Sequence, residues 1–149
     1  GSTMRLNYTD LAPESTDALW ALSKSIAKSS LDPQLRELVA VLVSIRNGCA
    51  HCISIHWQKA LHAGVPEESL RLVTAYRETK RFSAVERAAL DIADRMTTNL
   101  AGGVPEEMVH ALVRELGDEG TVMHLLYHVI LMNAWNRLSV AIGLKPPTD

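Results

Sequence analysis

The segment 121–142 limits the possible folds most strongly, because it is apolar on nearly every face of the helix that it would form. Gly143 closes this segment, and Pro146 with Pro147 prevents its continuation. A helix that is apolar all round must be covered on every side by other elements. Residues 38–43, which read Leu-Val-Ala-Val-Leu-Val, impose the same requirement. The chain therefore needs a fold that surrounds at least two of its segments.

Proline, glycine and capping residues divide the rest of the chain into segments of helical length. Asp32 before Pro33 is a helix start, and Ser83 with Glu86 fits the capping-box pattern. The predicted helices cover about 13–28, 33–47, 49–63, a segment from 66 onward, 84–96, 105–117 and 121–142. Residues 39–45 would also suit a buried strand, but no segment offers a partner strand. We therefore predict an all-α bundle of six to seven helices.

Composition indicates one domain that associates with copies of itself. Of the 149 residues, 47% are hydrophobic and only 5% aromatic, which favours helices over a β-sandwich or barrel. Residues 1–3 resemble the remnant of a removed tag, and we expect residues 4–149 to form a single domain. We expect a second copy to cover the excess apolar surface of 121–142, which predicts a homo-oligomer. The alternative is that this helix is the centre of a monomeric bundle.

Charge and hydropathy exclude several classes of partner. Fifteen Lys+Arg face 17 Asp+Glu, so the formal charge is -2 and there is no basic footprint for nucleic acid. No run reaches the ~18 apolar residues of a membrane-spanning helix, and the first residues lack the apolar region of a secretion signal. We therefore expect a cytoplasmic protein that binds neither nucleic acid nor membrane. In a reducing cytoplasm, two cysteines three positions apart suggest a redox pair or metal ligands rather than a structural crosslink.

Residues 47–56, Asn-Gly-Cys-Ala-His-Cys-Ile-Ser-Ile-His, carry the reactive side chains. At ~100° per residue, Cys49, Cys52 and His56 share one stripe of the predicted helix. His51 lies on another face, so it could act only through a neighbouring helix or subunit. Gly48 marks the N-terminus of the helix, where free N–H groups and the helix dipole stabilise a thiolate.

This spacing suits thiol redox chemistry. A thiolate that has reacted with an oxidant becomes a sulfenic acid, and a second thiol one helical step away condenses with it to a disulfide. His56, one turn beyond Cys52, is placed to take the thiol proton. Glu37 is the candidate to orient His56, because ionising this carboxyl at the start of an apolar run would be costly without a partner. An outside reductant would restore the thiols by exchange.

The pattern formed by Glu37, Cys49, His51, Cys52 and His56 resembles the core motif of the alkylhydroperoxidase D (AhpD) family, part of the carboxymuconolactone decarboxylase-like superfamily. The resemblance covers most of residues 32–144. It implies an AhpD-like helical bundle, assembly as trimers or hexamers, and thiol-dependent reduction of hydroperoxides. By position it implies that Cys52 is the peroxidatic thiol and Cys49 the resolving one. It further implies that His56 with Glu37 forms a proton relay, in which His51 can take part.

We therefore expect a thiol-dependent peroxidase without cofactor or metal, which uses a hydroperoxide and a protein or small-molecule thiol reductant. A lyase like carboxymuconolactone decarboxylase is an alternative, in which His56 and Glu37 act as acid and base and the cysteines are incidental. His124 and His128 have the i, i+4 spacing of metal ligands. One of them with the cysteines and His56 could complete a zinc site in a non-catalytic or redox-sensing oligomer. His51 would also suit a surface position.

Overall fold

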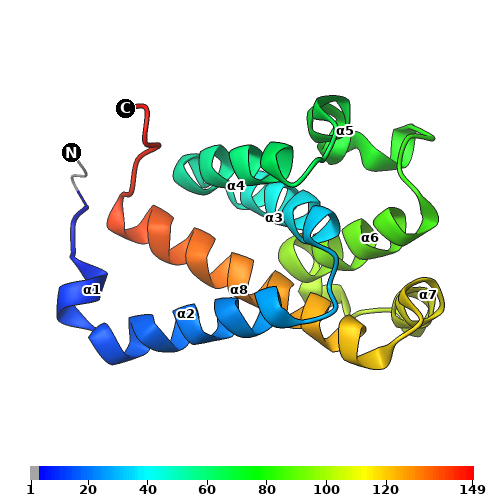
Figure 1. Ribbon diagram of the computed structural model, residues 1–149, viewed down its shortest axis with the longest axis horizontal. Coiled ribbons are helices and arrows are strands. Elements are labelled where there is room, and N and C mark those ends of the chain that lie inside the picture. The colour runs from blue at the N-terminus through cyan, green and yellow to red at the C-terminus, as the bar shows by residue number, and fades with distance from the viewer. Residues whose placement is uncertain (1–3) are drawn as a thin grey trace.

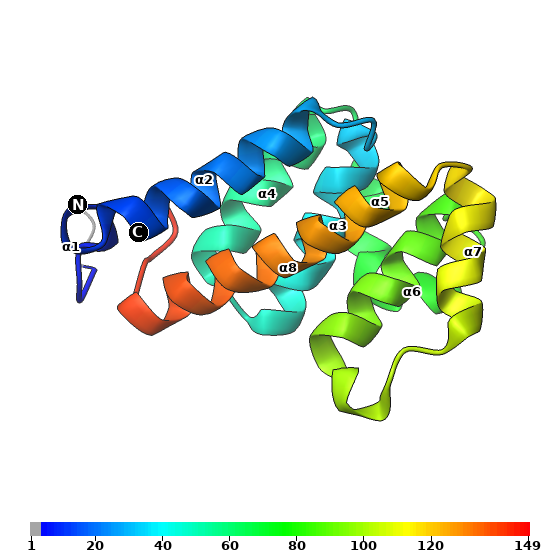
Figure 2. The same cartoon turned by 90° about the horizontal axis from the view of Figure 1, so that it is seen from below.

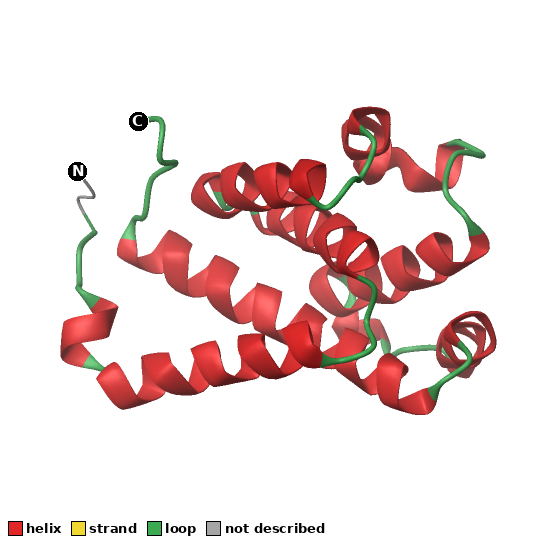
Figure 3. Cartoon of the chain, viewed as in Figure 1, coloured by secondary structure: helices red, strands yellow, loops and turns green. Residues whose placement is uncertain are grey.

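The computed structural model describes residues 4–149, and all regular elements within them are helical (Figure 3). The elements are α1 (Tyr8–Leu11), α2 (Pro13–Lys28), α3 (Pro33–Asn47), α4 (Ala50–His62), α5 (Glu67–Leu72), the 3-10 segment η1 (Val73–Glu78), α6 (Ala84–Thr98), the 3-10 turn η2 (Leu100–Gly102), α7 (Glu106–Leu116) and α8 (Glu119–Ile142). The all-α prediction is confirmed, including a helix rather than a strand over 39–45. Residues 1–3, the predicted tag remnant, lie outside the described residues.

Residues 4–149 contain eight α-helices, one more than the upper limit of the prediction. The additional helix is α1, which has four residues and buries none of them, so it has no apolar periodicity to reveal it. Asn7 starts it by accepting a hydrogen bond from the Asp10 N–H at 3.1 Å. The helix predicted from residue 66 onward is also shorter than a regular helix. It ends at Leu72, and the backbone of η1 departs from helical angles at Ala75.

The central helix is α3, which packs against α4, α6 and α8 (Figures 1 and 2). Residues 38–43 are at most 1% exposed. Burying a side chain such as Leu38 stabilises the fold by roughly 1.5–3 kcal/mol, so this run is a major part of the core. The prediction that these residues need cover on every side is therefore confirmed for α3.

The second apolar helix, α8, is covered on only part of its circumference. It packs against α2, α3, α6 and α7 and buries Leu125 and Val129 completely. Met123, Tyr127 and Ile130 are nevertheless 46–49% exposed. Apolar as α8 is, no helix within residues 4–149 has the length and hydropathy needed to cross a membrane. The exposed face of α8 is the surface that the predicted oligomer would cover.

The two ends of the described chain meet beside the start of α4. The backbone N–H of Arg5 donates to the Ile142 carbonyl at 2.7 Å, which holds the N-terminal residues against the end of α8. Figures 1 and 2 both show α1, in blue, and the C-terminal segment, in red, at the same end of the molecule. His51 Nδ1 donates to the Lys145 carbonyl at 2.9 Å. The predicted redox segment thus lies where both chain ends come together.

Candidate active site

Cys49 and Cys52 occupy the first turn of α4. Gly48, with φ 67°, ends α3 in the left-handed conformation, and Cys49 is the N-cap of α4. The Cys52 N–H donates to the Cys49 sulfur at 3.1 Å, and the two sulfurs form a disulfide. Both cysteines are at most 5% exposed, but Cys52 also lines a cavity. Cys52 is therefore the sulfur that a molecule in this cavity would reach.

Glu37 on α3 and His56 on α4 are hydrogen-bonded across the two helices. His56 Nδ1 lies 2.9 Å from Glu37 Oε1, and Arg36 Nε donates to Glu37 Oε2 at 3.1 Å. Burial would raise the pKa of Glu37, but hydrogen bonds and charge from His56 and Arg36 outweigh it and hold that pKa below its usual value. An ionised carboxylate only accepts, so Nδ1 carries the hydrogen. His56 Nε2 is thus the nitrogen available to take a proton.

His128 on α8 fixes the backbone next to Glu37. Its side chain is buried, and Nε2 donates to the Arg36 carbonyl at 2.8 Å. Burial lowers the pKa of His128 to about 4, so the ring is neutral near pH 7. We call Arg36, Glu37, His56 and His128 the Glu37 cluster.

The predicted pairing of His124 with His128 does not form a shared site. His124 Nδ1 instead donates to the Gly120 carbonyl of its own helix at 2.9 Å. Across residues 4–149, no group of three or more His, Cys, Asp or Glu side chains is arranged to hold a metal ion. The zinc alternative therefore has no ligand set in the described part of the chain.

Two cavities meet at His56. The larger, about 700 Å³, lies among α2, α3, α4 and α8 and is lined by Glu37, Arg36 and His62. The smaller, about 130 Å³, is lined by Cys52 and His51 and by aromatic side chains. Both cavities share Ser23, His56, Lys59 and Met132. A group in either cavity could therefore exchange a proton with His56. The structure also brings His51 into the site, through its bond to the C-terminal segment.

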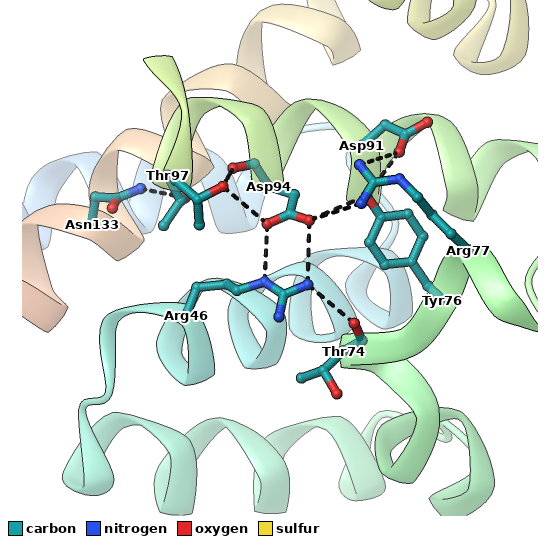
Figure 4. Close-up of polar contacts among 9 residues, drawn as sticks. Arg46, Thr74, Tyr76, Arg77, Asp91, Asp94, Thr97 and Asn133 are labelled. Atoms are coloured by element: carbon teal, nitrogen blue, oxygen red, sulfur yellow. Dashed lines mark hydrogen bonds and ion pairs between the residues drawn. The ribbon is translucent and has the colours of Figure 1, made fainter. Parts of the chain in front are cut away.

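A second buried carboxylate stands at the other end of α3 (Figure 4). Asp94 on α6 is 6% exposed and accepts from Arg46 Nε at 2.9 Å and from Arg77 at 3.4 Å. The Tyr76 hydroxyl donates to Asp91 at 2.7 Å, and burial together with Asp91 raises the pKa of this hydroxyl. These five residues, the Asp94 cluster, join α3, η1 and α6, and none of them lines either cavity at His56. Sequence reasoning did not find this cluster.

Sequence reasoning also left some site residues without a role. Arg36 stood beside Glu37 in the resembling segment but carried no assignment, and His128 was considered only as a metal ligand. Trp135 packs against the hydrophobic core and also lines the Cys52 cavity together with Tyr8 and Trp20. The scarcity of aromatic residues in the chain is the one signal that could have drawn attention to Tyr8, Trp20 and Trp135.

The chain matches the model of the carboxymuconolactone decarboxylase family over residues 13–95. The uncharacterized protein YdfG of Bacillus subtilis is 34% identical over 141 residues, which is 95% of both chains. A protein of unknown function from Agrobacterium tumefaciens, proposed to be the antioxidant defence protein AhpD, superposes with a TM-score of 0.90 at 28% identity. This match covers 99% of this chain and 100% of that one.

An uncharacterized peroxidase-related protein from Silicibacter superposes with a TM-score of 0.78 at 26% identity, over 90% of this chain and 71% of that one. Together these matches place the fold among AhpD-like proteins. The chain belongs to the carboxymuconolactone decarboxylase family, in the superfamily that also contains the AhpD-like proteins, which confirms the resemblance drawn from the motif.

Proposed function

We propose that this protein is a thiol-dependent peroxidase that reduces hydroperoxides with the Cys49–Cys52 pair. One observation carries the proposal: Cys52, bonded to Cys49, shares a cavity with His56, whose Nδ1 is held by the buried Glu37. A disulfide at a helix N-terminus next to a titratable group is typical of redox-active cysteines. The likeness to a peroxidase-related protein from Silicibacter and to a proposed antioxidant protein from Agrobacterium supports the same general role.

In the proposed reaction the reduced protein supplies two electrons. His56 takes the Cys52 thiol proton, and the thiolate attacks an oxygen of the hydroperoxide. The O–O bond breaks, Cys52 becomes a sulfenic acid, and the leaving alkoxide takes the proton from His56 to form an alcohol. The Cys49 thiol then attacks the Cys52 sulfur, so that a disulfide forms and water leaves. The expected product of this second step is the Cys49–Cys52 disulfide, the bond that joins these sulfurs in the structure.

Glu37 serves this reaction by holding His56. Its carboxylate keeps the hydrogen on Nδ1 and stabilises the imidazolium that forms when Nε2 takes the Cys52 proton. His51, whose Nδ1 is bonded to the Lys145 carbonyl, has its own Nε2 left for a second proton-transfer step. Neither role needs a cofactor or a metal.

A thiol reductant completes the proposed cycle. One thiol of a protein or small molecule, available in a reducing cytoplasm, attacks the Cys52 sulfur, releases the Cys49 thiol and forms a mixed disulfide. A second thiol then attacks the reductant sulfur of this mixed disulfide, so that Cys52 is released as a thiol and the reductant leaves as a disulfide. We also propose that the protein works as a trimer or hexamer in which the exposed face of α8 is covered by another copy. Sedimentation velocity of the wild type beside Ile130→Lys tests the assembly, because a charge on that face should dissociate it. A monomeric wild type would contradict it.

Counting thiols tests the proposed peroxidase. The reduced protein is freed of reductant, and its thiols are titrated before and after addition of one equivalent of hydroperoxide. We expect the wild type to lose two thiols and Cys52→Ser to keep its single one. Cys49→Ser is the matched control, because its Cys52 should stop at the sulfenic acid and be trapped by dimedone. Unchanged thiol counts in the wild type would rule the proposal out.

A lyase is the second candidate function, and the larger cavity favours it. Glu37 and His56 line this cavity together with Arg36 and Lys59, whose cationic groups could bind the carboxylate of a lactone acid. The family is also named after a decarboxylase. A Cys49→Ser, Cys52→Ser double variant separates the two functions. If it turns over carboxymuconolactone as fast as the wild type, the lyase is favoured, since the peroxidase requires both sulfurs.

A further inference from the structure

The cavity at Cys52 gathers an unusual share of the aromatic side chains of the protein. The chain has only three tryptophans, three tyrosines and one phenylalanine. Three of these seven, Tyr8, Trp20 and Trp135, line the one cavity of about 130 Å³ that contains Cys52. They come from α1, α2 and α8, which are far apart in sequence. Only the tertiary structure brings these rings together beside the sulfur.

The three rings form a row with Trp135 in the middle. The centroids of Trp20 and Trp135 are 4.9 Å apart, with their planes inclined at 47°. Tyr8 meets Trp135 edge-on at 6.3 Å. Such contacts restrict the rotamers of the rings, so an apolar aromatic surface is already present before anything binds. Trp20 remains 47% exposed, which leaves apolar ring surface that a ligand could cover.

A second part of the cavity lining is polar and reactive. His51, Cys52, His56 and Lys59 follow one another along α4 and all line the cavity. Because the cavity is small, a molecule whose ring contacts Trp135 would have its substituent near the Cys52 sulfur and His56. This combination of an aromatic part and a reactive part is what a substrate with one aromatic and one reactive end requires.

We propose that the cavity is a substrate subsite for a hydroperoxide that carries a single aromatic ring. The inference rests on the proposed function. A cavity of roughly 150 Å³ accommodates benzene, so a cavity of about 130 Å³ is close to the size of one aromatic ring. Ser23, His56, Lys59 and Met132 line both cavities, so other substituents of the same molecule can extend into the larger cavity. In the reaction, the O–O bond breaks at Cys52, which becomes the sulfenic acid, and the aromatic alcohol leaves.

Binding is tested without any turnover, on the oxidised wild-type protein. The indole N–H signals of its three tryptophans are followed by ¹H–¹⁵N NMR during titration with cumyl alcohol, the product of cumene hydroperoxide. We expect the signals of Trp20 and Trp135 to shift, while Trp57, which lines neither cavity at His56, stays in place as an internal control. Tert-butanol, which lacks the ring, should shift none of them. Equal shifts with both alcohols, or no shifts at all, would overturn the subsite.

Selectivity is tested by turnover in Trp20→Leu and in Leu100→Ala. Leu100 is 58% exposed and lines neither cavity at His56, so Leu100→Ala is the control for loss of exposed apolar surface. The ratio of kcat/KM for cumene hydroperoxide over tert-butyl hydroperoxide should fall about 3- to 10-fold in Trp20→Leu, since one ring–ring contact is lost. It should be unchanged in Leu100→Ala.

The outcomes separate the subsite from the peroxidase itself. If Trp20→Leu lowers both kcat/KM values equally, the aromatic subsite is wrong and the proposed function stands. If the wild type reduces neither hydroperoxide, the proposed function is wrong. The NMR titration then still decides whether the cavity binds an aromatic ring.

Discussion

Glu37 and Asp94 are both buried carboxylates that pair with an arginine, yet their surroundings differ in two respects. Asp94 is held by two arginines, Arg46 and Arg77, and none of its cluster lines a cavity at His56. Glu37 has one arginine and one histidine, and its histidine lines both cavities. An arginine keeps its proton at any pH at which the protein is folded, whereas a histidine can give its proton up.

A buried carboxylate can therefore serve either of two purposes in this protein. A carboxylate that is paired with arginines and lines neither cavity at His56 holds helices together. A carboxylate that orients a histidine at a cavity can control where a proton goes. The Asp94 cluster is thus expected to matter for stability and the Glu37 cluster for chemistry, and three experiments can break or sharpen this distinction.

The largest effect is expected for Glu37→Gln, which should lower the rate of thiol oxidation by peroxide. The neutral amide cannot stabilise the imidazolium of His56, so peroxide-dependent loss of thiols should slow about 1,000-fold, as for loss of other general acid–base groups. The free energy of unfolding should change by only about 1 kcal/mol, because glutamine retains hydrogen-bonding groups. Stopped-flow thiol oxidation and urea unfolding measure the two quantities. A rate equal to that of the wild type would remove Glu37 from the mechanism.

Asp94→Asn should do the reverse. Removing the charge of the buried Asp94 takes away the carboxylate that Arg46 and the more exposed Arg77 share, which should lower the free energy of unfolding by about 3 kcal/mol. Thiol oxidation by peroxide should keep its wild-type rate wherever the variant is folded. Urea unfolding, with Glu37→Gln as the matched neutral variant, provides the measurement. The distinction fails if Asp94→Asn slows oxidation as much as it destabilises the fold.

The smallest effect is an acid dependence that belongs to the Glu37 cluster alone. The pKa of His128 is about 4 in the folded protein, below its ordinary value of 6.5, so the unfolded chain takes up the proton first as the pH falls. The free energy of unfolding should therefore be insensitive to His128 above pH 6.5 and about 2 kcal/mol lower at pH 5. The pKa of Glu37 is below its own ordinary value, so Glu37 adds to this loss only at lower pH.

Urea unfolding at pH 7.5 and pH 5 measures this dependence. His128→Gln should lose the difference between the two pH values, while His124→Gln, which alters a histidine bonded only within its own helix, should keep it. Asp94→Asn should also keep the difference between the two pH values, because none of the contacts of the Asp94 cluster involves His128. A difference that persists in His128→Gln would assign the acid sensitivity to another group.

The helices were largely predictable because their start signals are local. Asp32 accepts from the Leu35 N–H, and Ser83 forms a capping box with Glu86, so each signal lies within four positions of the sequence. The short α1 escaped because a helix of four residues with none buried has no periodicity to detect. The break of the segment after Leu72 escaped because no proline or glycine marks it.

The candidate site was predictable in proportion to how local its geometry is. Cys52 and His56 lie on one helix, where spacing alone defines a shared stripe, and Cys49 is the N-cap of that helix. The contact of Glu37 with His56 links two consecutive helices, and it could be anticipated because a buried carboxylate needs a partner. The contact of His128 with the Arg36 carbonyl joins positions 92 residues apart, so no local sequence pattern predicts it.

The sequence by itself determined the all-α class, the starts of the main helices and the alignment of two sulfurs with a histidine, because each depends on neighbours within about one helical turn. The tertiary structure alone decided which carboxylate faces a cavity and which is locked between arginines. It also decided that Tyr8, Trp20 and Trp135 meet at Cys52. The physical reason is that packing α3 between α4, α6 and α8 sets these distances, and packing depends on the shapes of all the helices together.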